Sequence, residues 1–291
     1  MRLTRARLGE HVVLGRLEGD ELVVLAEESV RPGADVLREA LADAVDLSGP
    51  GHRVPLAEVS LLSPVSQPSK IICVGLNYAE HARESGETAP TAPVLFNKMP
   101  SAVVGPDQDI VVNADLSAQL DYEAELVVVI GKRVHRVSPE DALGAVLGYT
   151  AGNDVSARDA QFADGQWLRG KSFDTASPLG PVIVTADEIP DPQDLRVVCR
   201  VNGEVRQDDS TSQMVHSVAA LIAYASAFFT LEPGDVIFTG TPEGVGFART
   251  PPVYLVDGDK VEVEIERIGT LTNTVSIASS SSSTSAEGSA A

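Results

Sequence analysis

Apolar and polar residues alternate along much of the chain, and this pattern predicts more strand than helix. Within residues 1–62, the stretch "HVVLGRLEGDELVVLAEE" alternates on both sides of a Gly-Asp pair, which predicts a β-hairpin. A helix is expected near 33–44, and residues 61–70, with two prolines, predict a linker. We therefore expect a small β-rich N-terminal domain over 1–62 and a main domain over 63–277.

Strands also dominate the prediction for the main domain. Continuous apolar runs at 70–77 and 125–131 predict buried strands. Asn202-Gly203 and Asp257-Gly258 each predict the turn of a β-hairpin.

Three segments of the main domain have helical patterns. They are 78–86, 138–149 with Ser138 as its N-cap, and 213–229. Residues 278–291 are rich in Ser and Ala and predict a disordered tail. The order of elements indicates a strand-rich α+β fold.

Composition narrows the range of functions. The formal net charge of −20 argues against nucleic acid and membranes as partners. Only two cysteines are present, each in an apolar run, which favours free thiols in a cytoplasmic protein. The N-terminus has no signal-peptide pattern, and the longest apolar stretch, 218–229, is too short to span a bilayer. A cytoplasmic enzyme acting on a small molecule fits these features.

The stretch "DYEAELVVVIG" at 121–131 combines three carboxylates with a buried strand. Side chains alternate along a strand, so Asp121, Glu123 and Glu125 are expected on one face, where bare like charges would be costly. Together with Asp154 of "GNDVSARD", Glu123 and Glu125 suit a hard divalent cation, Mg²⁺ or Mn²⁺. The alternative is a solvated strand end that carries no ion.

Two further groups carry candidate chemistry. His81 and Glu84 share one face of the predicted helix at 78–86, so the carboxylate can orient the imidazole as a general base, unless the pair is an incidental surface contact. Lys171, between Gly170 and Ser172, could stabilise developing negative charge, although most lone lysines are surface residues. The chain has no GxSxG motif, which argues against a serine hydrolase.

The order of five motifs is specific even though each motif alone is not. "GLNYAEHARE", "DYEAEL", "GNDVSARDAQ", "RGKSFDT" and "GDVIFTGTPEGVG" follow one another as in the fumarylacetoacetate hydrolase family, which the chain resembles from about Lys70 to Val275. The resemblance implies a mixed β-sheet roll with few helices, preceded by a variable N-terminal domain, and a homodimer.

The resemblance also implies roles for individual residues. The metal ligands would be Glu123, Glu125 and Asp154, and the catalytic residues would be His81, Glu84 and Lys171. The substrate-binding residues would be Arg158, Gln161 and Thr241. Asp121 has no matching role and is expected behind the ligands or at the surface.

The reaction implied is metal-dependent hydrolysis of a C–C bond in a 2,4-dioxo acid, such as an acylpyruvate, fumarylpyruvate or a 2,4-dioxo-3-deoxy sugar acid. His81 would activate water, and pyruvate enolate would leave as a metal-stabilised anion assisted by Lys171. An alternative with the same site is an oxaloacetate-type decarboxylase or a 2-hydroxyhepta-2,4-diene-1,7-dioate isomerase. A second alternative is a non-catalytic protein that binds metal or ligand, since a fold alone does not fix function.

Overall fold

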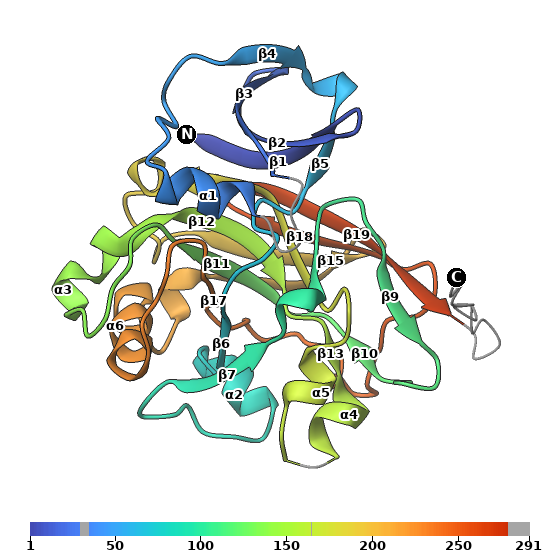
Figure 1. Ribbon diagram of the computed structural model, residues 1–291. Coiled ribbons are helices and arrows are strands. Elements are labelled where there is room, and N and C mark those ends of the chain that lie inside the picture. Colours follow the sequence, from blue (N-terminus) through green and yellow to red (C-terminus); the bar gives the residue numbers. More distant parts are fainter. Residues whose placement is uncertain (30–34, 164, 279–291) are drawn as a thin grey trace, which may run out of the picture.

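The computed structural model describes residues 1–29, 35–163 and 165–278. As predicted, it is rich in strands, and these form mixed sheets (Figure 1).

The helices are few and short. They are α1 (Val36–Ala42), α2 (Ala79–Glu84), α3 (Pro139–Ala142), α4 (Arg158–Phe162), α5 (Leu168–Lys171) and α6 (Val218–Phe228). Among the described residues, no helix has both the length and the apolar composition needed to cross a membrane.

The N-terminal strands curl together at one end of the molecule, drawn in blue at the top of Figure 1. They are β1 (Arg2–Leu8), β2 (His11–Glu18), β3 (Glu21–Glu27), β4 (His52–Pro55) and β5 (Ser60–Leu62). The predicted hairpin is β2–β3, and the predicted helix is α1, although residues 33 and 34 of that prediction lie outside the described residues. β1 also pairs with a strand of the main sheet, through Arg2↔Val184 and Leu3↔Ile183. The domain boundary near residue 62 therefore stays a prediction.

The main sheet continues from β1 in the order β14, β12, β11, β17, β6 and β7. These strands are β6 (Ile71–Gly75), β7 (Val94–Lys98), β11 (Ala124–Ile130), β12 (Val146–Asn153), β14 (Ser177–Thr185) and β17 (Val236–Phe238). The short β8 (Val103–Val104) pairs with β14, and β10 (Leu120–Asp121) pairs with β13 (Ser156–Ala157). β17 runs parallel to β6, whereas β11 is antiparallel to both of its neighbours.

A second sheet packs against the first. It contains β9 (Ile110–Asn113), β15 (Arg196–Val201), β16 (Glu204–Ser210), β18 (Lys260–Ile265) and β19 (Gly269–Ala278). Val128 on one face of β11 belongs to the large core shared with this second sheet, whereas Val127 and Val129 on the other face pack in a core with α1. β11 is thus buried on both faces, which explains its unbroken apolar run.

Two predicted elements are wrong. The helix predicted over 138–149 ends at Ala142, and after a single 3-10 turn the chain becomes β12, because residues from Val146 onward pair with β11. Asp257-Gly258 does not join two strands, since the segment before it has no strand; the hairpin is β18–β19, with its turn at 266–268. By contrast, Asn202-Gly203 does join β15 and β16.

Further predictions agree with the structure at the two cysteines and, in part, over 213–229, whereas residues 61 and 62 of the predicted linker belong to β5. Cys73 and Cys199 are buried free thiols. The predicted helix at 213–229 corresponds to α6, which begins after the N-cap Ser217. Apart from Ala278, at the end of β19, the predicted tail lies outside the described residues.

Candidate metal and acid–base site

Three carboxylates meet where β11 begins and β12 ends. β11 and β12 are antiparallel with Glu125 opposite Gly152, so Asp154, just after β12, lies beside Glu123, just before β11. The backbone amide of Asp154 donates to the Glu123 carbonyl at 2.9 Å. One carboxylate oxygen from each of Glu123, Glu125 and Asp154 lies within 4.8 Å of the others, and all three residues are buried. The structure therefore brings together the three acids that the sequence singled out.

The position of Asp121 differs from the one predicted from the sequence. It belongs to β10, and residues 122 and 123 lie in no strand, so Asp121, Glu123 and Glu125 do not share one strand face. Asp121 is also fully buried, which excludes the surface position. Its carboxylate pairs with Arg158, as described further below.

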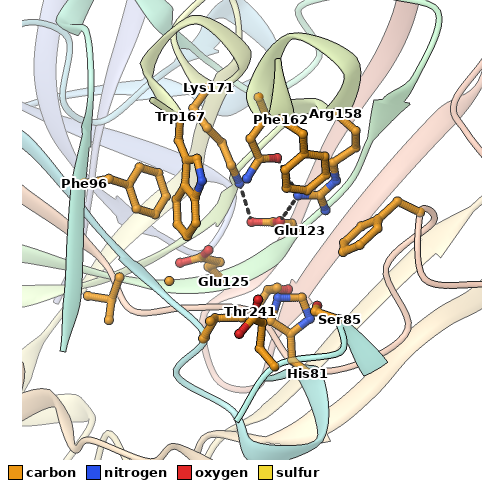
Figure 2. Close-up of a pocket in the computed structure, with 16 residues that line it drawn as sticks. His81, Ser85, Phe96, Glu123, Glu125, Arg158, Phe162, Trp167, Lys171 and Thr241 are labelled. Carbon is orange, nitrogen blue, oxygen red and sulfur yellow. Dashed lines mark hydrogen bonds and ion pairs between the residues drawn. The ribbon is translucent and has the colours of Figure 1, made fainter. Parts of the chain in front are cut away.

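Two buried lysines compensate part of the negative charge. Lys171 Nζ lies 2.8 Å from Glu123 Oε2 (Figure 2). It also lies 2.9 Å from Asp154 Oδ2. Lys98 Nζ lies 2.5 Å from the other oxygen of Asp154 and 3.2 Å from the carbonyl of Val155. Lys98 is a residue of the site that the sequence alone does not single out; the available signal is a single lysine at the end of the apolar strand β7.

Glu123 and Glu125 differ in their electrostatic surroundings. Burial acts to raise the pKa of Glu123, but Lys171, Arg158 and His81 lower it, and its net pKa falls below the usual value. Burial, Asp154 and Glu123 together raise the pKa of Glu125 well above its usual value.

Glu125 is consequently the least compensated acid of the cluster. Among the described residues, its carboxylate accepts one hydrogen bond, from Gly240 N at 2.7 Å. A buried carboxylate next to two others is costly unless a cation balances it. An all-oxygen cluster of three carboxylates is also the ligand type that Mg²⁺ and Mn²⁺ prefer, so the residues fit a divalent cation.

His81 and Glu84 form a hydrogen-bonded pair on α2. His81 Nδ1 lies 2.9 Å from Glu84 Oε1, and Glu84 Oε2 accepts from Gly244 N at 2.9 Å. Glu84 therefore orients the ring and attaches α2 to the loop after β17. Among the described residues, the second ring nitrogen of His81 makes no hydrogen bond, so it is available to exchange a proton.

One cavity of about 150 Å³ is lined by His81, Glu123, Glu125 and Lys171. Figure 2 shows Glu123 and Glu125 between Lys171 and Arg158 on one side and His81 on the other. The remaining lining includes four aromatic side chains, those of Phe96, Phe162, Trp167 and Phe247. The cavity is smaller than sites for drug-sized ligands, which occupy roughly 300–1,000 Å³, and it suits a small acid.

The predicted substrate-binding residues also line this cavity. Arg158 Nη1 lies 3.0 Å from Gln161 Oε1 and 2.7 Å from Glu123 Oε1. Thr241 Oγ1 donates to the carbonyl of Ala124 at 2.9 Å, so a contact between its hydroxyl and a substrate carboxylate would require that bond to be exchanged.

Known proteins share both sequence and structure with this chain. A family model described as "Fumarylacetoacetate (FAA) hydrolase C-terminal" matches residues 70–276. Oxaloacetate tautomerase FAHD2A, a mitochondrial protein of Bos taurus, is 48% identical over 242 residues, which covers 82% of this chain and 75% of that protein.

Two solved structures extend the similarity to nearly the whole chain. The X-ray structure of 5-carboxymethyl-2-hydroxymuconate delta-isomerase from Mycobacterium smegmatis is 41% identical, with a TM-score of 0.79 over 96% of this chain and 100% of that one. A structure of fumarylacetoacetate hydrolase from Exiguobacterium antarcticum is 42% identical, with a TM-score of 0.82 over the same shares.

Proposed function

Because the chain belongs to the fumarylacetoacetate hydrolase family, we propose that it is a divalent-metal-dependent enzyme that interconverts the keto and enol forms of a small 2-oxo diacid of the oxaloacetate type. The names of its relatives support this choice. One is an oxaloacetate tautomerase and another is a hydroxymuconate isomerase, and both names describe proton shifts without bond hydrolysis. They favour the first alternative from the sequence, a decarboxylase or isomerase with the same site, over C–C bond hydrolysis.

The observation that carries the proposal is the composition of the cavity. Two carboxylates of the undercompensated cluster, Glu123 and Glu125, line the same small cavity as an oriented imidazole and two cations, Lys171 and Arg158. A tautomerase needs these parts: a means of acidifying the C–H next to a carbonyl, a base to move the proton, and positive charge near the oxygen that becomes an enolate.

Glu123, Glu125 and Asp154 would hold the cation. The chemistry that a divalent cation supplies when bound is Lewis-acid polarisation of the 2-oxo group, which acidifies the neighbouring C–H. The metal identity, Mg²⁺ or Mn²⁺, is part of the proposal.

His81 is the proposed proton carrier. Because its Nδ1 faces the Glu84 carboxylate, its Nε2 is the basic nitrogen and can carry the proton between C3 of the substrate and the oxygen on C2. Lys171 balances negative charge on the substrate oxygen, and Arg158 and Gln161 bind a carboxylate. The reaction moves one proton and one double bond, so it consumes no other reactant.

The decisive experiment measures three reactions of one purified enzyme under Mg²⁺ and under Mn²⁺. They are the enol–keto conversion of oxaloacetate, pyruvate release from oxaloacetate and pyruvate release from a series of acylpyruvates. We expect the first to be faster than the uncatalysed rate and the other two to be slower than the first. Absence of enol–keto catalysis with either metal would refute the proposal.

Hydrolysis of a 2,4-dioxo acid remains the second candidate, and one observation favours it. A His–Glu pair beside the three-carboxylate cluster could equally activate a water molecule. Pyruvate release from an acylpyruvate faster than oxaloacetate tautomerisation would select this candidate. A homodimer and a cytoplasmic location remain predictions.

A further inference from the structure

Asp121 is a fully buried carboxylate with four donors around it. Its Oδ1 accepts from the backbone amides of Tyr122 at 2.9 Å and Gly246 at 2.7 Å. Its Oδ2 accepts from the amide of Phe247 at 3.0 Å and from Arg158 Nε at 2.9 Å. Asp121 therefore joins the loop at 246–247 to the guanidinium that lines the cavity.

These contacts fix the orientation of the Arg158 side chain. Its Nε is bound to Asp121, and its Nη1 is shared by Gln161 and Glu123. Its Nη2 lies 2.9 Å from Asp121 Oδ2 without hydrogen-bond geometry, and within the described parts of the chain it has no hydrogen-bond partner. The ring of Phe247 covers the guanidinium at 4.4 Å. Of the five N–H donors, the two on Nη2 are thus the ones without an acceptor, and Nη2 is itself buried beside Asp121.

We propose that Asp121 is a positioning residue, which holds the guanidinium of Arg158 at the cavity wall, where it can bind a carboxylate of the substrate. The inference rests on the proposed function in one respect, namely that Arg158 binds an anionic substrate. Without Asp121, Glu123 would be the one carboxylate bound to the guanidinium. Arg158 would then turn toward the cluster, and the guanidinium would lose its fixed place at the cavity wall. The substrate class that this arrangement recognises is a small diacid, bound partly through the cation that the cluster would hold and partly by the charged guanidinium.

The test is a double-mutant cycle with oxalate as the probe. Asp121→Asn, Arg158→Met and the double variant are titrated with oxalate by calorimetry in the presence of Mn²⁺. A hydrogen bond to a charged group contributes about 1.5–3 kcal/mol, so we expect Asp121→Asn to weaken oxalate binding about tenfold or more. In the Arg158→Met background the same change should have an effect of about twofold or less, because Asp121 acts through Arg158. An equal loss in both backgrounds overturns the inference.

The Mn²⁺ affinity of Asp121→Asn shows whether Asp121 acts by positioning Arg158 or by changing metal binding at the three-carboxylate cluster. Asp121 contributes no oxygen to the three-carboxylate cluster, so Asp121→Asn should change the Mn²⁺ dissociation constant by less than about threefold. A fall in Mn²⁺ affinity that matches the fall in oxalate affinity contradicts the proposal.

Asp35→Asn is the matched control. Asp35 is equally buried and also accepts three backbone amides, from Arg38, Ser66 and Gln67, but none of these donors belongs to a residue that lines the cavity. This variant should lose stability and keep the oxalate affinity of the wild type. If Asp121→Asn does not fold, Arg158→Lys takes its place, because a lysine keeps the charge without the planar group that Asp121 orients. Wild-type oxalate affinity in Arg158→Lys overturns the inference.

Failure of the proposed function can be told apart from failure of this inference. Oxalate binding requires no turnover, and a crystal structure of Asp121→Asn requires no ligand. If the wild type neither turns over oxaloacetate nor binds oxalate, the proposed function fails. The crystal structure then decides the positioning role: a guanidinium that has left its place supports it, and one that still contacts both Gln161 and Glu123 overturns it.

Discussion

Lys98 Nζ lies 2.5 Å from Oδ1 of Asp154, and both side chains are fully buried. Removing one partner of a buried ion pair costs about 3–5 kcal/mol, because the other charge is left uncompensated. Lys98→Met should therefore be strongly destabilised in EDTA. The cluster would also become more negative, so Mn²⁺ should raise the melting temperature more in Lys98→Met than in the wild type.

Lys70→Met provides the control for this prediction. Lys70 also pairs with a buried aspartate, Asp235, at 2.7 Å, but Asp235 is not one of the three clustered carboxylates. Thermal melts with and without Mn²⁺ should show the same metal-induced shift in Lys70→Met and wild type. If Lys98→Met gains no more from Mn²⁺ than Lys70→Met does, Lys98 does not balance the charge of the cluster.

Substitutions in the His81–Glu84 pair should lower the catalytic rate and leave substrate binding nearly unchanged. General acid–base catalysis contributes about 10²–10⁴-fold, so His81→Ala should lower kcat by that order and Glu84→Gln by a smaller factor. Glu80→Gln is the control, since Glu80 lies on the same helix and pairs with the exposed Arg83. Unchanged kcat in His81→Ala would remove His81 from the mechanism.

Gly170 sets the distance between α4 and α5. A Cβ on Gly170 would lie 2.6 Å from the backbone of Gln161, so Gly170→Ala should push apart the segments that carry Arg158 and Lys171. We expect a lower melting temperature and a lower oxalate affinity. Gly144→Ala should change neither, because a Cβ there would have no atom within 4 Å. Wild-type oxalate affinity in Gly170→Ala would show that the site tolerates movement of α5.

Asp35 should contribute to the loss of folding stability at low pH. Burial acts to raise its pKa, but hydrogen bonds from Arg38, Gln67 and Ser66 hold the pKa below its usual value of 3.8. The ionised carboxylate therefore stabilises the folded state above the unfolded pKa, and this contribution is lost as the pH falls through the folded pKa.

Asp35→Asn removes that titration. Urea unfolding between about pH 6 and pH 3 should show a smaller decrease in the free energy of unfolding for the variant than for the wild type. At about pH 6 the variant should be less stable by about 1–2 kcal/mol, the usual worth of an N-cap hydrogen bond. Parallel curves for both proteins would show that Asp35 does not contribute to acid unfolding.

Much of the site could be predicted because strand pairing fixes it. Glu123, Glu125 and Asp154 meet through the antiparallel register of β11 and β12, and the motifs mark both strands. Likewise His81 and Glu84 are neighbours on a single short helix, so their contact follows from their spacing alone.

Contacts made by tertiary packing were not predictable in this way. Lys98 reaches Asp154 across 56 residues of sequence, and a lysine that ends a strand gives no sign of its partner. The partner of Asp121, Arg158, lies on another element, and its loop donors come from residues 246–247. The helix predicted over 138–149 failed because pairing with β11 outweighs the local helical pattern.

The central claim is that the reaction depends on a metal bound at the three-carboxylate cluster, and Glu125→Gln tests it most directly. The measurement is the initial rate of oxaloacetate enol–keto conversion in the variant and the wild type, under saturating Mg²⁺ or Mn²⁺. The substitution removes an undercompensated buried charge, so the variant should melt in EDTA at the wild-type temperature or above. Our account predicts that its rate falls about 100-fold or more, and that EDTA lowers the wild-type rate to the same level. A variant that keeps the wild-type rate, or a wild-type rate that EDTA does not change, would contradict a metal-dependent reaction at this cluster.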